Sequence, residues 1–117
     1  SERWLAACKK TLRGFSQVTY LHGGIEAMKG QKDQFDLIYC HFVLHDIPDG
    51  DLERVISGLA SCLKTGGTFL FRDPLAQVQK LNRIKALAQQ CGLVKKDSRI
   101  TDVPLMGNTL ENKYIKQ

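Results

Sequence analysis

The sequence lacks long hydrophobic runs, and this absence sets a first limit on what the protein can be. No apolar run in its 117 residues approaches the roughly 18 residues that a helix needs to cross a bilayer. No secretory signal is visible. The composition, 43% hydrophobic and 25% charged, is ordinary for a globular protein, and the length suits one domain. We therefore expect residues 1–117 to form a single domain without a membrane segment.

Closely spaced cysteine pairs are also missing. The four cysteines form no Cys-x-x-Cys pair, and each falls at an apolar position of an expected helix or strand. This pattern predicts buried, reduced thiols in a cytoplasmic protein and no metal site. The residues concerned are Cys8, Cys40, Cys62 and Cys91.

Aromatic side chains are few, which limits how the positive charge can be interpreted. The formal net charge is +5, but the lysines and arginines are scattered over expected helices. A nucleic-acid surface would gather them beside stacking aromatics, and only five Phe, three Tyr and one Trp are present. Solvated helix faces explain the charge better, so a nucleic-acid partner is not expected.

The most informative pattern lies in the middle of the chain. Residues 35–40 are a nearly continuous apolar run, as a strand buried on both faces requires. Residues 50–64 then place apolar side chains at helical spacing, with Asp49 expected to cap the helix. The Gly66-Gly67 pair is expected to end it before a second buried strand at 68–72. The pattern predicts a strand–helix–strand unit whose crossover makes the two strands parallel.

Further elements are expected on both sides of this unit. Apolar spacing and capping residues predict helices at 2–13 and 75–91. Alternating β-branched and aromatic residues predict a strand at 18–22, and shorter patterns predict strands at 93–96 and 111–115. The fold class expected is therefore α/β.

Three of these segments together resemble the class I S-adenosylmethionine-dependent methyltransferases. They are Phe-Asp-Leu-Ile at 35–38, Val-Leu-His-Asp-Ile-Pro-Asp at 43–49 and Leu-Lys-Thr-Gly-Gly-Thr at 63–68. Their order and spacing resemble the family's fourth strand, fourth helix and fifth strand. The resemblance implies a partial Rossmann-like, doubly wound and mainly parallel sheet with flanking helices and an antiparallel strand near the C-terminus. It also implies S-adenosylmethionine as cofactor and a small-molecule methyl acceptor.

The family's glycine-rich cofactor turn is missing. That turn reads Asp/Glu-x-Gly-x-Gly-x-Gly after the first strand, and the glycine pairs at 23–24 and 66–67 have neither its spacing nor its position. The chain therefore resembles the C-terminal part of a methyltransferase core without the first two strands, which in the family lie between the third and the fourth. From this we expect weak or undetectable cofactor binding by this chain alone. We also expect the open strand edge at 35–40 to find a strand neighbour foreign to the family or to form an intermolecular sheet.

The resemblance places three residues beside the cofactor. Gly24, Ile25 and His41 follow expected strands, at the carboxyl ends where open α/β sheets bind ligands. In the family the residue matching Gly24 is often an Asp or Asn bonded to the adenine amino group, so that contact is in doubt here. The next residue, Ile25, would still offer its backbone N–H to an adenine ring nitrogen, and His41 would lie near the methionine end. The alternative for Gly24 is a turn glycine that supplies a positive φ.

His45 resembles the general base of small-molecule O-methyltransferases. An imidazole suits this task because its pKa lies near neutrality, and Asp46 or Asp49 could orient it. The alternative, which a single His beside a single Asp favours, is that His45 merely packs or caps before the helix. Methyl transfer depends mainly on holding donor and acceptor in line, so the activity does not require this base.

Three readings of function therefore stay open. The first is the C-terminal part of a methyltransferase acting on a small molecule. The second is a methyltransferase-like, non-catalytic interaction subunit. The third is a piece of another doubly wound nucleotide-binding enzyme, such as a dehydrogenase, and the segment at 41–67 matches it less well.

Overall fold

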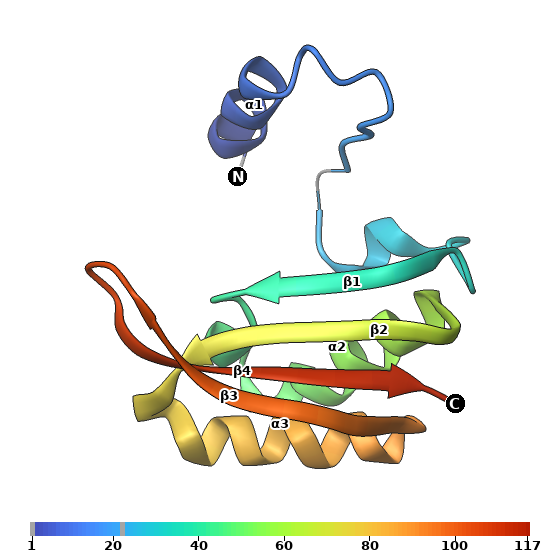
Figure 1. Ribbon diagram of the computed structural model, residues 1–117. Coiled ribbons are helices and arrows are strands. Elements are labelled where there is room, and N and C mark those ends of the chain that lie inside the picture. The colour runs from blue at the N-terminus through green and yellow to red at the C-terminus, as the bar shows by residue number, and fades with distance from the viewer. Residues whose placement is uncertain (1, 22) are drawn as a thin grey trace.

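The computed structural model describes residues 2–21 and 23–117 (Figure 1). Three α-helices, four strands and three short 3-10 turns follow one another along these residues. In chain order they are α1 (Glu2–Thr11), η1 (Ile25–Met28), β1 (Phe35–His41), η2 (Leu44–Asp46), α2 (Asp49–Cys62), β2 (Leu63–Pro74), η3 (Leu75–Gln77), α3 (Val78–Gln90), β3 (Leu93–Val103) and β4 (Gly107–Lys116).

The four strands form one mixed sheet in the order β1-β2-β4-β3. β1 and β2 are parallel, as expected, because α2 connects them as a crossover. β4 is antiparallel both to β2 and to its hairpin partner β3. The predicted α/β, Rossmann-like class is confirmed, although only one of its strand pairs is parallel because the last two strands form a hairpin.

The core lies between one face of the sheet and the helices α2 and α3. Leu52 and Ile56 of α2 and Leu81 of α3 are buried against Phe71 and Tyr114 of the sheet. Each such side chain contributes about 1.5–3 kcal/mol through burial. Both helices therefore bind the sheet through the apolar stripes that the sequence predicted, and they fix the carboxyl ends of β1 and β2.

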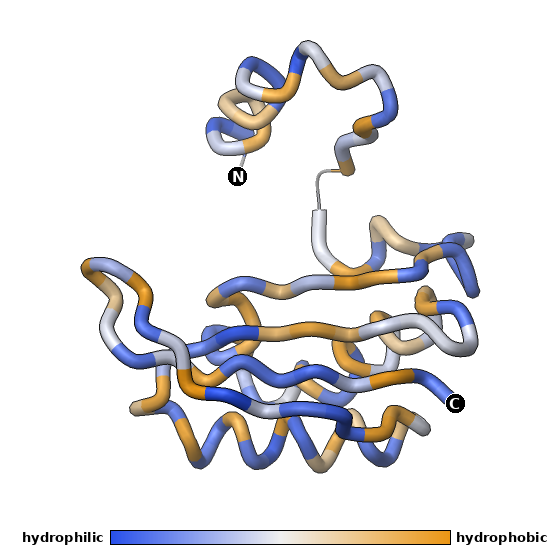
Figure 2. Tube along the Cα trace, viewed as in Figure 1, coloured by the Kyte–Doolittle hydropathy of each residue, from blue (hydrophilic) through white to orange (hydrophobic). Residues whose placement is uncertain are grey.

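The opposite face of the sheet has no helix over it among the described residues. Leu37 and Tyr39 of β1 are 57% and 46% exposed there, and Figure 2 shows the apolar middle of β1 and β2. α1 buries none of its residues and lies apart from the sheet in Figure 1. The described chain thus covers the sheet on one side only.

Most predicted elements are confirmed with shifted ends. The helices expected at 2–13, 50–64 and 75–91 correspond to α1, α2 and α3, and α3 starts three residues late because the turn η3 precedes it. The strand expected at 35–40 is β1. β2 and the two C-terminal strands are longer than expected, since the antiparallel pairing of β4 with both β2 and β3 continues through residues of low apolar content.

The strand predicted at 18–22 is wrong for residues 18–21, which form no regular structure. His22, the last residue of that prediction, lies outside the described residues. A strand exists only when its backbone pairs with a neighbour, and within the described chain β1 pairs with β2 alone. The local preference of Val18, Thr19 and Tyr20 for extended structure therefore yields no ladder.

The glycine pair does not end α2, and Asp49 does not cap it. The helix ends at Cys62, and its N-cap position is Pro48, without a side-chain cap. The glycines lie inside β2, where the pairing to β1 jumps from Leu63 to Thr68. Gly66 has φ +84, and a Cβ on Gly67 would lie 2.8 Å from the Lys64 carbonyl oxygen. The bulge in the strand, and not the helix end, requires this pair.

The cysteines differ in environment more than the sequence predicted. Cys62 is buried, Cys40 and Cys91 are half-buried, and Cys8 is exposed, so the expectation of a buried thiol is wrong for Cys8. Burial and the nearby Asp73 raise the pKa of Cys40 to about 11. The described residues contain no group of three side chains that could hold a metal ion. None of the helices in the described ranges is long and apolar enough to cross a membrane.

Candidate functional site

A cavity of about 440 Å³ lies between η1, α2 and the carboxyl end of β1. Gly24 and Ile25 line it from the loop that precedes β1, and Cys40 lines it from β1 itself. Leu44 and Val55 are among the apolar side chains that complete the wall. The two chain segments whose ends the sequence placed beside a ligand thus meet at one cavity.

Gly24 has an ordinary backbone conformation. Its φ is −84 and its ψ is −160, so the idea that glycine is needed here for a positive φ is wrong. The positive φ, +140, belongs to Gly23. A Cβ at Gly24 would lie 2.8 Å from Oε2 of Glu26, the end of a flexible side chain that is 59% exposed and would shift to admit it.

Two contacts hold η1 against α2. Ile25 lies so close to Gly58 that a Cβ there would be 2.6 Å from its Cγ1. Arg54 of α2 forms an ion pair with Glu26, and its other terminal nitrogen is 3.6 Å from Asp51. The cavity wall formed by η1 therefore depends on a small residue and an arginine of the helix opposite.

His41 does not line this cavity. It ends β1, and its Nδ1 is 3.1 Å from the hydroxyl of Tyr39. Its ring stacks on Phe42 with 4.4 Å between ring centroids. The structure thus separates His41 from Gly24 and Ile25, with which the sequence had grouped it.

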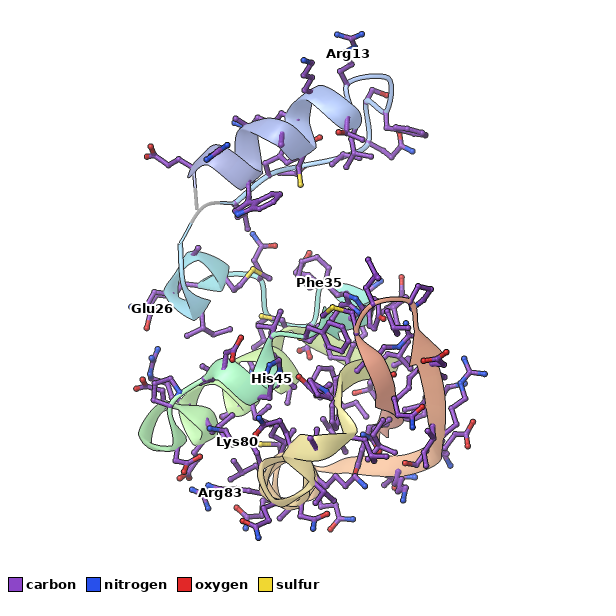
Figure 3. The ribbon with its side chains drawn as sticks, turned by 90° about the vertical axis from the view of Figure 1, so that its left-hand side faces the viewer. Arg13, Glu26, Phe35, His45, Lys80 and Arg83 are labelled. Atoms are coloured by element: carbon purple, nitrogen blue, oxygen red, sulfur yellow. The ribbon has the colours of Figure 1, made fainter. Side chains whose placement is uncertain are left out.

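His45 lies in the short turn η2 and points toward the end of β2. Its Nδ1 is 2.7 Å from Oδ1 of Asp73, and its backbone N–H donates to the same oxygen at 3.2 Å. The imidazole is 15% exposed, whereas the carboxylate of Asp73 is fully buried. Figure 3 looks onto this end of the sheet and labels His45 above Lys80 of α3.

The pair His45–Asp73 has the chemistry of an oriented base. Burial raises the pKa of Asp73, while the hydrogen bonds from His45 act in the opposite direction. When ionised, Asp73 accepts the Nδ1–H bond, so that Nε2 becomes the nitrogen that can take a proton. Nε2 is 3.3 Å from Asp46, whose side chain is 78% exposed and free to move aside.

Of the two carboxylates expected beside His45, Asp46 contacts its Nε2, whereas Asp73, which holds Nδ1, was not expected. Asp49 does not contact His45, and instead forms an ion pair with Lys80 at 2.8 Å. Lys80 also donates to the carbonyl oxygen of Ile47 at 2.5 Å, which ties the turn after His45 to α3. The hydrogen bond from Lys80 and its positive charge lower the pKa of Asp49.

Four residues of the site escaped the sequence analysis: Glu26, Arg54, Asp73 and Lys80. Asp73 had a usable signal, because it is an acidic residue that directly follows the strand expected at 68–72. Parallel strands bring such a residue to the edge where the loop after β1 lies. Glu26, Arg54 and Lys80 form contacts between different loops and helices. The spacing of residues along the sequence does not predict such contacts.

Known proteins share both sequence and fold with this chain. Residues 1–67 match the family described as methyltransferase domain. An uncharacterized methyltransferase of Synechocystis sp. (strain ATCC 27184 / PCC 6803 / Kazusa) is 35% identical over 57 residues, which cover 49% of this chain and 27% of that protein.

Two solved structures illustrate the likeness in fold. The N-methyltransferase NodS from Bradyrhizobium japonicum WM9, in complex with S-adenosylhomocysteine, superimposes with a TM-score of 0.82 and 14% identity, covering 99% of this chain and 63% of NodS. The 1,6-didemethyltoxoflavin-N1-methyltransferase of Burkholderia thailandensis, with bound 1,6-didemethyltoxoflavin and S-adenosylhomocysteine, superimposes with a TM-score of 0.74 and 17% identity, covering 96% of this chain and 56% of that protein.

The family match extends over more than half of the chain. The chain spans less than two thirds of the length of each of these three proteins. The two solved structures share the fold of this chain, and the sequence of this chain carries the motif order of the family. The chain belongs to the class I S-adenosylmethionine-dependent methyltransferases.

Proposed function

We propose that this chain is the C-terminal part of a methyltransferase core that transfers a methyl group from S-adenosylmethionine to a small molecule. The observation that carries the proposal is the cavity in which Gly24 and Ile25 meet the carboxyl end of β1. Its position at parallel strand ends is where open α/β sheets bind ligands. The missing glycine-rich turn supports the view that further strands belong to the complete enzyme.

The cavity suits the adenine end of the cofactor. Its volume of about 440 Å³ and its apolar wall suit a flat heterocycle, and Gly24 leaves room at the position where a Cβ would otherwise intrude. In this proposal the backbone N–H of Ile25 meets a ring nitrogen. His41 is proposed to lie near the methionine end, outside the adenine cavity. The ribose has no evident partner among these residues, so this chain alone would bind the cofactor weakly.

The cofactor, when bound, supplies an activated methyl group, and the residues of this chain would prepare the acceptor. We propose that His45 takes a proton from an acceptor hydroxyl at Nε2. Asp73 keeps the proton on Nδ1 and fixes the ring, because it accepts from both the ring and the backbone of His45. The isolated chain would be inactive, since nothing in this proposal lets it hold the whole cofactor.

The test replaces His45 and its partner in the complete enzyme that we propose to contain this chain. His45→Ala should lower kcat by ~10²-fold or more and leave cofactor affinity unchanged. Asp73→Asn should lower kcat by at least ~10-fold, because the ring loses its tautomer and orientation. A normal kcat in His45→Ala would rule out the base, and His45 would then only pack in the turn.

The alternative is a non-catalytic subunit that binds another chain through β1. The open edge of this strand favours it, because β1 has a strand neighbour on one side only in the described part of the chain. The two proposals differ in what restores activity. The enzyme needs the cofactor-binding strands in the same protein, whereas the subunit would increase the activity of a separate methyltransferase without binding cofactor itself.

We also propose a cytoplasmic location for the protein, which the four unpaired cysteines support.

We further propose that nucleic acid is not the methyl acceptor. Arg54, the arginine that lines the cavity, is paired with Glu26 and so is not available to a phosphate.

A further inference from the structure

Asp73 is a fully buried carboxylate, and its two oxygens differ in their partners. Oδ1 lies 2.7 Å from Nδ1 of His45 and accepts a hydrogen bond from the backbone N–H of His45 at 3.2 Å. Oδ2 has no hydrogen-bond partner among residues 2–21 and 23–117. A buried polar atom without a partner destabilises the folded state, the more so when it carries charge. The ionised form of Asp73, which orients His45, therefore needs a donor at Oδ2.

Asn112 of β4 offers the complementary group. Its side chain is fully buried, and its Oδ1 accepts a hydrogen bond from the hydroxyl of Ser98 at 2.8 Å. Its Nδ2 can only donate, and it has no partner in the part of the chain that the structure describes. The core thus encloses one acceptor and one donor that each lack a partner.

The sheet places these two side chains on the same face of neighbouring strands. β2 lies between β1 and β4 (Figure 1). Asp73 pairs with Leu110, and Asn112 pairs with Phe71, so Asp73 and Asn112 are diagonal neighbours. Such neighbours are about 7–8 Å apart at Cα and closer at Cβ. Two short polar side chains at this spacing can share one water through hydrogen bonds of about 2.7–3.2 Å.

We propose that one buried water joins Oδ2 of Asp73 to Nδ2 of Asn112, and that Asn112 is thereby a positioning residue for His45. The water would accept from Nδ2 and donate to Oδ2, so each atom gains the partner that it lacks. A chain of hydrogen bonds would then run from Ser98 to His45 through the amide, the water and the carboxylate. The consequence for catalysis rests on the proposed function, because it takes His45 as the base.

Tyr114 provides a matched control on the same strand. Its side chain is fully buried, and its hydroxyl also has no partner among the described residues. It pairs with Phe69 and lies four residues from Leu110, the partner of Asp73, which is a distance of about 13 Å along a strand. Tyr114→Phe therefore removes an unpartnered polar atom that is no neighbour of Asp73.

The first test is a crystal structure of the 117-residue chain. It should show one water within about 3.2 Å of both Oδ2 of Asp73 and Nδ2 of Asn112. In Asn112→Leu, which has no donor at this position, the water should be absent. A wild-type structure without a water between these two atoms would overturn the proposal.

The second test follows the carboxyl carbon of Asp73 by NMR as the pH changes. The titratable groups that face Asp73 are His45 and Asp46 from η2 and the thiol of Cys40 from β1. Asn112→Leu leaves these groups in place but removes the donor to Oδ2. It should raise the pKa of Asp73 above the wild-type value, because the ionised form loses a hydrogen bond.

A milder variant keeps this test decisive if Asn112→Leu does not fold. Ser98 is half-buried, and Ser98→Ala frees the amide of Asn112 without emptying the core. It should raise the pKa of Asp73 in the same direction by a smaller amount, whereas Tyr114→Phe should leave it unchanged. An Asp73 pKa that is the same in wild type and in the folded Asn112→Leu or Ser98→Ala variants would contradict the link.

Activity of the complete enzyme separates this inference from the proposed function. Asn112→Leu should lower kcat by about 5-fold with an unchanged KM for the acceptor, the effect expected of one neutral hydrogen bond. If the titrations behave as expected but His45→Ala has a normal kcat, the water link stands and the proposed base is wrong. If the pKa of Asp73 does not respond to either variant, the link is wrong whatever the value of kcat.

Discussion

Glu111 lies between two arginines on adjacent strands and is 7% exposed. Arg72 binds its Oε2 at 2.5 Å, and Arg99 binds its Oε1 at 2.7 Å. Burial alone would raise the pKa of Glu111, but the hydrogen bonds and charges of both arginines lower it below the ordinary 4.5. A carboxyl whose pKa is lowered by folding stabilises the protein above its unfolded pKa. That stabilisation disappears as the pH falls through the folded value.

Replacement of Glu111 therefore has a pH-dependent effect. Glu111→Gln should lower the free energy of unfolding by about 2 kcal/mol at pH 7, because two arginines lose their counter-charge. The difference from wild type should shrink as the pH falls below the ordinary pKa of 4.5 and through the lowered pKa of the folded state. Urea unfolding at a series of pH values measures it. A difference that stays constant down to pH 3 would show that the carboxylate charge contributes nothing.

Two residues show which contacts could not be predicted from the sequence. His45 was identified as a candidate, but its partner was not, because Asp73 is 28 positions away and reaches it only through the pairing of β1 with β2. The alternative explanation of Gly24, a positive φ, was wrong because its φ is −84. The partner of His45 was missed because the contact joins segments whose relative position the sequence does not state.

At the scale of elements, η1 depends on the surface of α2. Gly58→Ala adds a Cβ that would lie 2.6 Å from Cγ1 of Ile25, so it should push η1 away from the helix. Gly50→Ala is the matched control, because it lies in the same helix and its Cβ would meet nothing within 4 Å. The control should raise stability by ~0.5–1 kcal/mol through helix propensity.

The Gly58→Ala variant should lose that gain and weaken adenosine binding at Ile25. Thermal unfolding measures the first effect, and titration with adenosine, followed by the backbone amide signal of Ile25, measures the second. Equal stabilisation by both substitutions, with unchanged binding, would mean that η1 does not rest on α2 in solution.

The short turn η2, which carries His45, is held in place by a contact from α3. Lys80→Met keeps the aliphatic stem but removes the bond from Nζ to the Ile47 carbonyl oxygen, so it should cost about 1 kcal/mol of stability. It should also speed hydrogen exchange of the His45 amide, which donates to Asp73. Arg83→Met removes a charge one turn further along the same helix, where the side chain is exposed, and should do neither. The prediction fails if both variants change exchange equally.

Elements with strong local signals were predictable and those that depend on a partner were not. α2 and α3 followed from their apolar stripes, and β1 and β2 from their apolar runs. The expectation that the strand at 35–40 is buried on both faces was wrong, because β1 has no buried residue and exposes Leu37 and Tyr39 on the face without a helix. Residues 18–21 have the composition of a strand, yet no described strand pairs with them. Pairing is a property of the whole sheet, and local propensity cannot supply a missing neighbour.

At the scale of the whole molecule, the two edges of the sheet differ. β3 carries the exposed Lys95 and Lys96 and an irregular register there, which are features that protect an edge. β1 instead presents Leu37 and Tyr39, and no second strand covers it among the described residues. The predicted intramolecular neighbour for this strand is therefore absent from the described chain, and an intermolecular one remains the prediction.

Self-association should accordingly run through β1. Sedimentation velocity on the chain should give a sedimentation coefficient that rises with concentration. Tyr39→Lys places a charge on the open edge and should reduce the rise. Ile100→Lys changes a 62% exposed residue on the opposite edge and should leave it unaltered. A chain that stays monomeric at every concentration would refute the role of this edge.

The central claim is that this chain carries the adenine end of a methyltransferase cofactor site and lacks the rest. Titration of S-adenosylhomocysteine into the 117-residue chain, followed by backbone amide signals, tests it most directly. We expect shifts confined to the residues around the cavity, at 23–28, 40–44 and 51–59, with a dissociation constant near or above ~1 mM. Micromolar affinity, or shifts that leave these residues unchanged, would contradict it.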